Sequence, residues 1–128
     1  MTDRTPRRLL VLLLGFTAVS TLGVTTGSSV FQEQPSRHDV TINSRKYEFS
    51  PARIEIRQDD VLRVTLVAED IPHSFTIDEY RIAKRAVPGR PLTFEFRADK
   101  PGSFTYYCNL TLDDGCREMR GELVVVAR

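Results

Sequence analysis

Tryptophan is absent from this 128-residue sequence, and histidine and cysteine each occur only twice. Any chemistry that needs an imidazole must therefore use His38 or His73. The formal net charge is +1, which gives no electrostatic reason to expect nucleic-acid binding. No glycine-rich phosphate loop and no Ser/His/Asp arrangement is evident, so we expect no enzymatic activity.

The N-terminal region combines basic residues with a charge-free stretch. Arg4, Arg7 and Arg8 precede an apolar run, and no charged residue occurs between Leu9 and Val30. This pattern is typical of a secretory signal peptide, and its length would also allow an uncleaved membrane anchor. We therefore predict a signal peptide or N-terminal anchor over residues 1–30 and a polar linker over 31–39. Either alternative places the remainder of the chain outside the cytoplasm, in the periplasm or an equivalent compartment. The uncleaved alternative would also anchor it to the membrane by its N-terminus.

Residues 40–128 have the length of one domain and the pattern of an all-β protein. Turn signals such as Ser50-Pro51, Pro88-Gly89 and Pro101-Gly102 separate short segments in which apolar and polar residues alternate. No segment has a convincing helical period, so we predict a β-sandwich or barrel. Residues 78–87 fit either a strand or an excursion with a helical turn. The alternating segments are 40–49, 53–57, 62–66, 73–77, 92–97, 103–108 and 121–126.

The polar loop between the last two predicted strands contains both cysteines, Cys108 and Cys116, followed by Met119. Sulfur ligands between two strands can build a copper site, and His73 is predicted to point into the core like Cys108. In an exported protein, however, a pair of cysteines commonly forms a disulfide. Closing this short loop would contribute about 2.5 kcal/mol in the chain-entropy model. The residues alone leave both alternatives open. His38 precedes the first predicted strand and is expected to be solvated.

The order of motifs resembles the cupredoxin superfamily, and within it the copper-binding domain of cytochrome c oxidase subunit II. The resemblance rests on segments spread over most of residues 40–128: DIPHSFTI at 70–77, PG at 88–89, GSFTYYC at 102–108 and MRGELVV at 119–125. It implies a Greek-key β-sandwich or barrel with copper at one end, used for electron transfer.

The resemblance also implies a set of ligands. His73, Cys108 and Met119 match the upstream histidine, the cysteine and the methionine of the oxidase domain, whose loop reads Cys-x3-Cys-x3-His-x2-Met. Here Leu112 stands at the second cysteine position and Cys116 at the histidine position. A dinuclear centre would need two histidines, so we predict one metal ion bound by His73, Cys108, Cys116 and Met119.

Two thiolates would favour Cu(I), and the same soft set could hold Zn(II). Asp113 or Glu118 could add an oxygen ligand.

Three hypotheses follow from this sequence. The first is a one-electron carrier with a mononuclear copper site, serving a redox protein or a membrane oxidase. The second is a copper carrier that delivers metal to a membrane oxidase. The third is a metal-free cupredoxin module closed by a Cys108–Cys116 disulfide.

Overall fold

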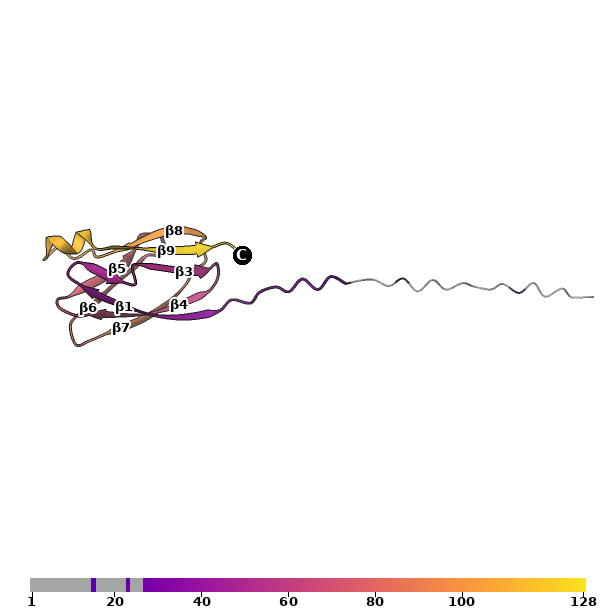
Figure 1. Ribbon diagram of the computed structural model, residues 1–128, viewed down its shortest axis with the longest axis horizontal. Helices are drawn as coiled ribbons and strands as arrows, with labels where there is room; N and C mark the ends of the chain where they lie inside the picture. The colour runs from indigo at the N-terminus through magenta and orange to yellow at the C-terminus, as the bar shows by residue number, and fades with distance from the viewer. Residues whose placement is uncertain (1–14, 16–22, 24–26) are drawn as a thin grey trace, which may run out of the picture. The chain divides into compact units, whose positions relative to one another are not determined.

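The computed structural model describes residues 15, 23 and 27–128, and Gln32–Arg128 form one compact unit (Figure 1). The predicted signal peptide or anchor, residues 1–30, lies mostly outside the described residues. No helix among the residues described is both long and apolar enough to cross a membrane. The elements of the compact unit are β1 (Arg37–Arg45), β2 (Glu48–Ser50), β3 (Arg53–Arg57), β4 (Val61–Ala68), β5 (His73–Ile77), η1 (Asp78–Tyr80), β6 (Ile82–Ala86), β7 (Leu92–Arg97), β8 (Gly102–Tyr107), η2 (Asp114–Glu118) and β9 (Arg120–Val126).

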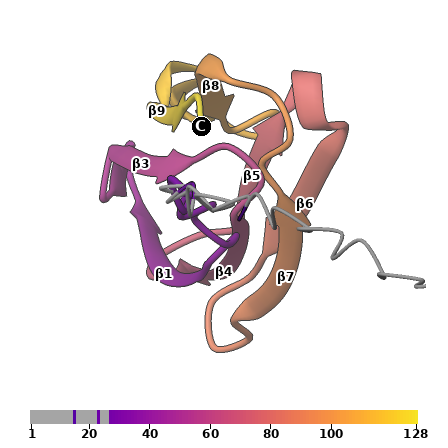
Figure 2. The same cartoon turned by 90° about the vertical axis from the view of Figure 1, so that its right-hand side faces the viewer.

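The strands form two sheets, which confirms the predicted all-β sandwich. One sheet has the order β2-β1-β4-β7, and the other has the order β3-β9-β8-β5-β6. Figure 2 shows β8 and β9 lying across the core from β1, β4 and β7. Two of the pairings are parallel, β1 with β4 and β3 with β9, and both join strands that are not consecutive in the chain.

The core lies between the sheets and follows the alternation of the sequence. Leu62, Val64 and Leu66 of β4 are 0–1% exposed, as period two predicts. Aromatic rings hold the two sheets together at the centre, because Tyr106 stacks on Phe75 with ring centroids 4.8 Å apart and meets Phe49 edge-on at 5.4 Å. Burial of these side chains is the main favourable contribution to folding.

The first strand begins earlier than its alternation indicates. β1 starts at Arg37, within the segment expected to be a linker, because it pairs in parallel with β4 from Arg37 opposite Val61. His38 therefore belongs to a strand and does not precede it, while its side chain is solvent-exposed as expected. Its Nε2 lies 2.6 Å from Oδ2 of the buried Asp60, although 44% of its side chain remains exposed.

Residues 78–87 contain both structures that were left open for them. A single 3-10 turn, η1, is followed by β6, which pairs with β5 at the edge of the five-stranded sheet. Arg81 joins them with a left-handed φ of 54°.

The loop that carries the cysteines lies between β8 and β9, at the end of the sandwich opposite the C-terminus (Figure 1). Gly121, the second residue of β9, pairs directly opposite Tyr106 of β8. A Cβ at this glycine would lie 2.0 Å from the Tyr106 ring, so the close approach of the two strands requires glycine here. The tyrosine ring is fixed in turn, because its hydroxyl donates to the carbonyl of Pro51 at 2.8 Å.

Candidate metal centre

The four side chains predicted to bind metal come from one end of the sandwich. His73 is the first residue of β5, and Cys108 directly follows β8. Cys116 lies in η2, and Met119 connects that turn to β9. All four residues are 0–1% exposed. The pairing of Thr76 with Tyr107 brings β5 beside β8, which is why residues 35 positions apart share one site.

Cys108 and Cys116 are bonded to each other, with their Cα atoms 5.2 Å apart. Neither cysteine is free, so the structure holds the disulfide alternative of the two proposed from the sequence. Two thiolates become available only after reduction. The assignment of the cysteines as copper ligands stays a prediction, and it applies to the reduced chain.

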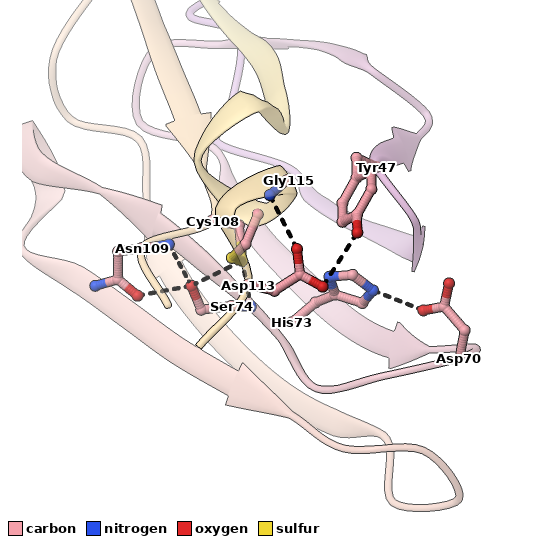
Figure 3. The surroundings of a disulfide bond; sticks show 9 residues. Tyr47, Asp70, His73, Ser74, Cys108, Asn109, Asp113 and Gly115 are labelled. Carbon is pink, nitrogen blue, oxygen red and sulfur yellow. Dashed lines mark hydrogen bonds and ion pairs between the residues drawn. A yellow bond between two sulfur atoms is a disulfide. The ribbon is translucent and has the colours of Figure 1, made fainter. Parts of the chain in front are cut away.

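His73 is held by one nitrogen and leaves the other without a partner. Its Nε2 lies 2.7 Å from Oδ1 of Asp70 (Figure 3), whereas its Nδ1 is buried and has no hydrogen-bond partner. A buried imidazole nitrogen without a partner is costly unless it has a ligand to bind. An Asp70 carboxylate that accepts the Nε2 proton leaves the lone pair on Nδ1, and this is the form in which histidine binds a metal.

The Asp70 carboxylate is kept ionised by its surroundings. Burial raises the pKa of Asp70, but hydrogen bonds from the Lys46 N–H, His73 and the Ile71 N–H outweigh burial and bring the pKa down to about 2. The two backbone donors lie 2.7 Å from the carboxylate oxygens. Asp70 therefore remains a hydrogen-bond acceptor for His73 at neutral pH.

Ser74 surrounds the sulfur of Cys108 with donors (Figure 3). Its backbone N–H points at Sγ from 3.4 Å and its hydroxyl lies 3.7 Å away. The same hydroxyl lies 2.7 Å from Oδ1 of Asn109 and accepts from the Asn109 N–H at 2.8 Å. Because a hydroxyl has a single proton, its closer contact with Asn109 takes that proton while the disulfide is intact.

The two oxygen ligands suggested by the sequence, Asp113 and Glu118, do not point to a metal site in the disulfide-bonded structure. Asp113 caps η2 by accepting the Gly115 N–H at 2.9 Å, and its other oxygen accepts the hydroxyl of Tyr47 at 3.1 Å (Figure 3). Both carboxylate oxygens thus hold the loop, and Glu118 is exposed. In the disulfide-bonded state, no group of three or more His, Cys, Asp or Glu side chains is arranged as a metal site within the described part of the chain.

A small pocket of about 220 Å³ opens beside the disulfide. Leu112 at its rim is 88% exposed, although it stands where the oxidase pattern has its second cysteine. Cys116 lines this pocket and Cys108 does not. The full lining is Ile71, Pro72, Leu110, Leu112, Asp113 and Cys116.

The residues present fit a copper ion once the disulfide is reduced. His73 Nδ1 is buried and has no hydrogen-bond partner, so its lone pair is available to a metal, and three sulfur side chains lie at the same end of the sandwich. Sequence reasoning missed the supporting residues Asp70, Ser74 and Asn109. A signal for the first was available, since an aspartate three positions before a candidate ligand histidine can orient the imidazole.

The cupredoxin-like domain family matches residues 10–125 of the sequence. The chain belongs to this family. The cupredoxin resembles a heme-copper terminal oxidase dimer solved by cryo-electron microscopy, with 23% identity and a TM-score of 0.66, over 78% of this chain and 75% of that chain.

Two structures of cytochrome oxidase subunit II also resemble this cupredoxin. The periplasmic domain of the Bradyrhizobium japonicum subunit has 16% identity and a TM-score of 0.62, over 70% of this chain and 83% of that chain. A mixed disulfide between a thioredoxin-like protein and the subunit gives 18% identity and a TM-score of 0.58, over 70% of this chain and 81% of that chain. These likenesses confirm the cupredoxin fold and its similarity to subunit II. They show the fold and not the ligands.

Proposed function

We propose that this chain is an exported cupredoxin that binds one copper ion through His73, Cys108, Cys116 and Met119 after its disulfide is reduced, and that it transfers single electrons. The observation that carries the proposal is the buried Nδ1 of His73, which has no partner although Asp70 fixes the ring. Family membership adds support, because the solved relatives include a heme-copper oxidase.

The protein residues would hold and shield the site. Asp70 orients the His73 ring, and the Ser74 N–H can stabilise negative charge on the Cys108 sulfur. Met119 and both cysteines are 0–1% exposed, which limits their contact with water and helps keep the surroundings fixed while charge changes. Bound copper would supply the one-electron couple. We propose no enzymatic reaction for the chain.

The proposed partners are a dithiol reductant and a membrane oxidase or other redox protein. A thioredoxin-like protein forms a mixed disulfide with subunit II of cytochrome c oxidase, and this chain has the same fold and a disulfide to reduce. The subunit II domain is periplasmic, which supports an extracytoplasmic location for this cupredoxin, either released or anchored through residues 1–30.

The test is a visible absorption and EPR spectrum of the full-length protein after reduction, addition of Cu(II) and removal of excess metal, with thiols counted before reduction. We expect no free thiols at the start, two after reduction, and then one EPR-active copper per chain with a thiolate-to-copper absorption band. Retention of no copper after reduction would refute the proposal and favour the metal-free module.

Copper delivery is a second candidate, and the disulfide favours it. Oxidation of Cys108 and Cys116 removes two of the four ligands, so a redox reaction could release the metal. A colourless protein that holds Cu(I), has no reversible potential and passes copper to an acceptor would identify this function. A reversible potential with no copper transfer would favour electron transfer.

A further inference from the structure

The two sulfurs of the disulfide have different surroundings. Cys116 lines the pocket of about 220 Å³ that opens at the rim formed by Leu112. Cys108 is absent from that lining, and its sulfur instead faces the donors of Ser74. A thiol that enters the pocket therefore meets Cys116 first.

We infer that reduction of this disulfide starts with attack on Cys116 and that Cys108 is the leaving sulfur. The inference rests on the proposed function to the extent that reduction must precede copper binding. The attacking group is the active-site cysteine of a dithiol protein of the thioredoxin type, because such a reductant carries both thiols needed to finish the exchange.

The exchange is balanced in two steps. The reductant's first thiolate forms a bond to the Cys116 sulfur, the Cys108–Cys116 bond breaks, and its electron pair stays on Cys108 as a thiolate. The reductant's second thiol, after losing its proton, attacks its own first sulfur, and Cys116 leaves as a thiolate. The reductant becomes a disulfide, so two electrons pass to the cupredoxin.

Ser74 explains why Cys108 is the better leaving group. A leaving thiolate departs faster when it is stabilised, and the Ser74 N–H already points at the Cys108 sulfur from 3.4 Å. The Ser74 hydroxyl, now 2.7 Å from Asn109, can turn to the sulfur 3.7 Å away once negative charge develops there. No equivalent hydrogen bond is made to the Cys116 sulfur within the described residues.

The test traps the intermediate with a thioredoxin whose resolving cysteine is replaced by serine. The oxidised full-length protein is mixed with this thioredoxin, quenched early in acid and alkylated. A protease that cleaves before aspartate separates the two sites, since Cys108 falls in 99–112 and Cys116 in the peptide that starts at Asp114. We expect thioredoxin on Cys116 and alkylation on Cys108, in an excess of about tenfold over the reverse. Thioredoxin on Cys108, or an equal division, would overturn the inference.

Charge at the rim gives a second test. Leu112→Asp places a carboxylate at the pocket entrance, and Thr111→Asp adds the same charge at the neighbouring exposed residue, which does not line the pocket. We expect the first variant to react about tenfold more slowly with thioredoxin, because like charge repels an approaching thiolate, and the second to react much faster than the first. Equal rates in both variants would overturn entry through this pocket.

Neither experiment contains copper. A failed copper titration with attack still on Cys116 would refute the proposed function alone, whereas attack on Cys108 would refute this inference and leave copper binding intact.

Discussion

The chain has two histidines, each hydrogen-bonded to an aspartate, and the two His–Asp pairs lie at opposite ends of the sandwich. His73 Nε2 lies 2.7 Å from Asp70, and His38 Nε2 lies 2.6 Å from Asp60. The hydrogen bonds are alike, but burial is reversed. In the first pair the imidazole is 0% exposed and the carboxylate side chain 33%, whereas in the second the imidazole side chain is 44% exposed and the carboxylate 2%.

The buried member of each pair is the one that its surroundings hold in place, and it is the aspartate in one pair and the histidine in the other. Asp60 is the centre of its network, because it accepts hydrogen bonds from His38, the Ser36 N–H, the Arg57 N–H and Arg128. It ties the start of β1 and the C-terminus to β4, beside a pocket of about 360 Å³ that His38 and Asp60 help to line. In the other pair the imidazole is central and Asp70 positions it. A histidine–aspartate pair thus stabilises the fold at one end of the sandwich, and at the other end the second pair orients the proposed metal ligand His73.

The largest expected difference is in copper affinity. His73→Gln should lower the Cu(I) affinity of the reduced protein by more than about 100-fold, since it removes a ligand and not merely its support. His38→Gln should leave that affinity unchanged. Competition with a coloured Cu(I) chelator measures both, and circular dichroism checks that each variant is folded. Equal losses in the two variants would break the comparison.

Replacing each aspartate by asparagine tests whether Asp70 supports copper binding by orienting His73. Asp70→Asn should lower Cu(I) affinity by about 10- to 100-fold, because it weakens the contact that fixes the ring and proton of His73. Asp60→Asn, at the other end, should not change it. The same chelator competition serves here, and an unchanged affinity in Asp70→Asn would show that the ring is held without it.

Stability should show the opposite ranking. Burial raises the pKa of Asp60, but hydrogen bonds from Ser36, His38, Arg128 and Arg57 outweigh it and bring the pKa to about 2. Against the ordinary value of 3.8, that shift corresponds to about 2 kcal/mol at pH 7. Asp60→Asn should lower the free energy of unfolding by about this amount in urea titrations. Asp39→Asn, whose side chain is 72% exposed, is the matched control and should change it little.

The smallest predicted effect is a pH dependence. Both aspartates have folded pKa values of about 2, below the ordinary 3.8, so their contributions are complete above about pH 4 and are lost as the pH falls towards 2. The wild-type melting temperature should fall over this interval. Asp60→Asn should flatten the curve more than Asp70→Asn, because Asp70 is a third exposed and solvent weakens its interactions. Parallel curves for the two variants would contradict the ranking.

Much of the fold could be predicted because alternation alone determines which residues face the core. Leu62, Val64 and Leu66 are buried as period two requires. The same rule places Ser74 on the outer face of β5, yet Ser74 is 2% exposed, so alternation does not predict its burial. β5 is an inner strand of its sheet, and the loop after β8 covers its outer face through Asn109. Which loop covers a strand is a tertiary property that period two does not contain.

The candidate site was also predictable from the sequence only in part. His73, Cys108, Cys116 and Met119 could be placed at one end of the sandwich, because strand ends and the loop after Cys108 fix that position. The oxidation state of the cysteines could not, since the same spacing suits a disulfide and a pair of ligands. The role of His38 was missed because its partner, Asp60, becomes a neighbour only through the parallel pairing of β1 with β4.

The position of β9 in its sheet has a consequence for how the domain forms. β9 lies between β3 and β8, and its register with β3 pairs Arg53 with Glu122, residues far apart in the chain. Pairings at such separation close large loops and are typical of domains that fold in milliseconds to seconds. Until β9 inserts, β3 lacks its sheet partner and the cysteine loop is held at one end only. The end of the molecule that carries the proposed metal site is therefore completed by the last segment of the sequence.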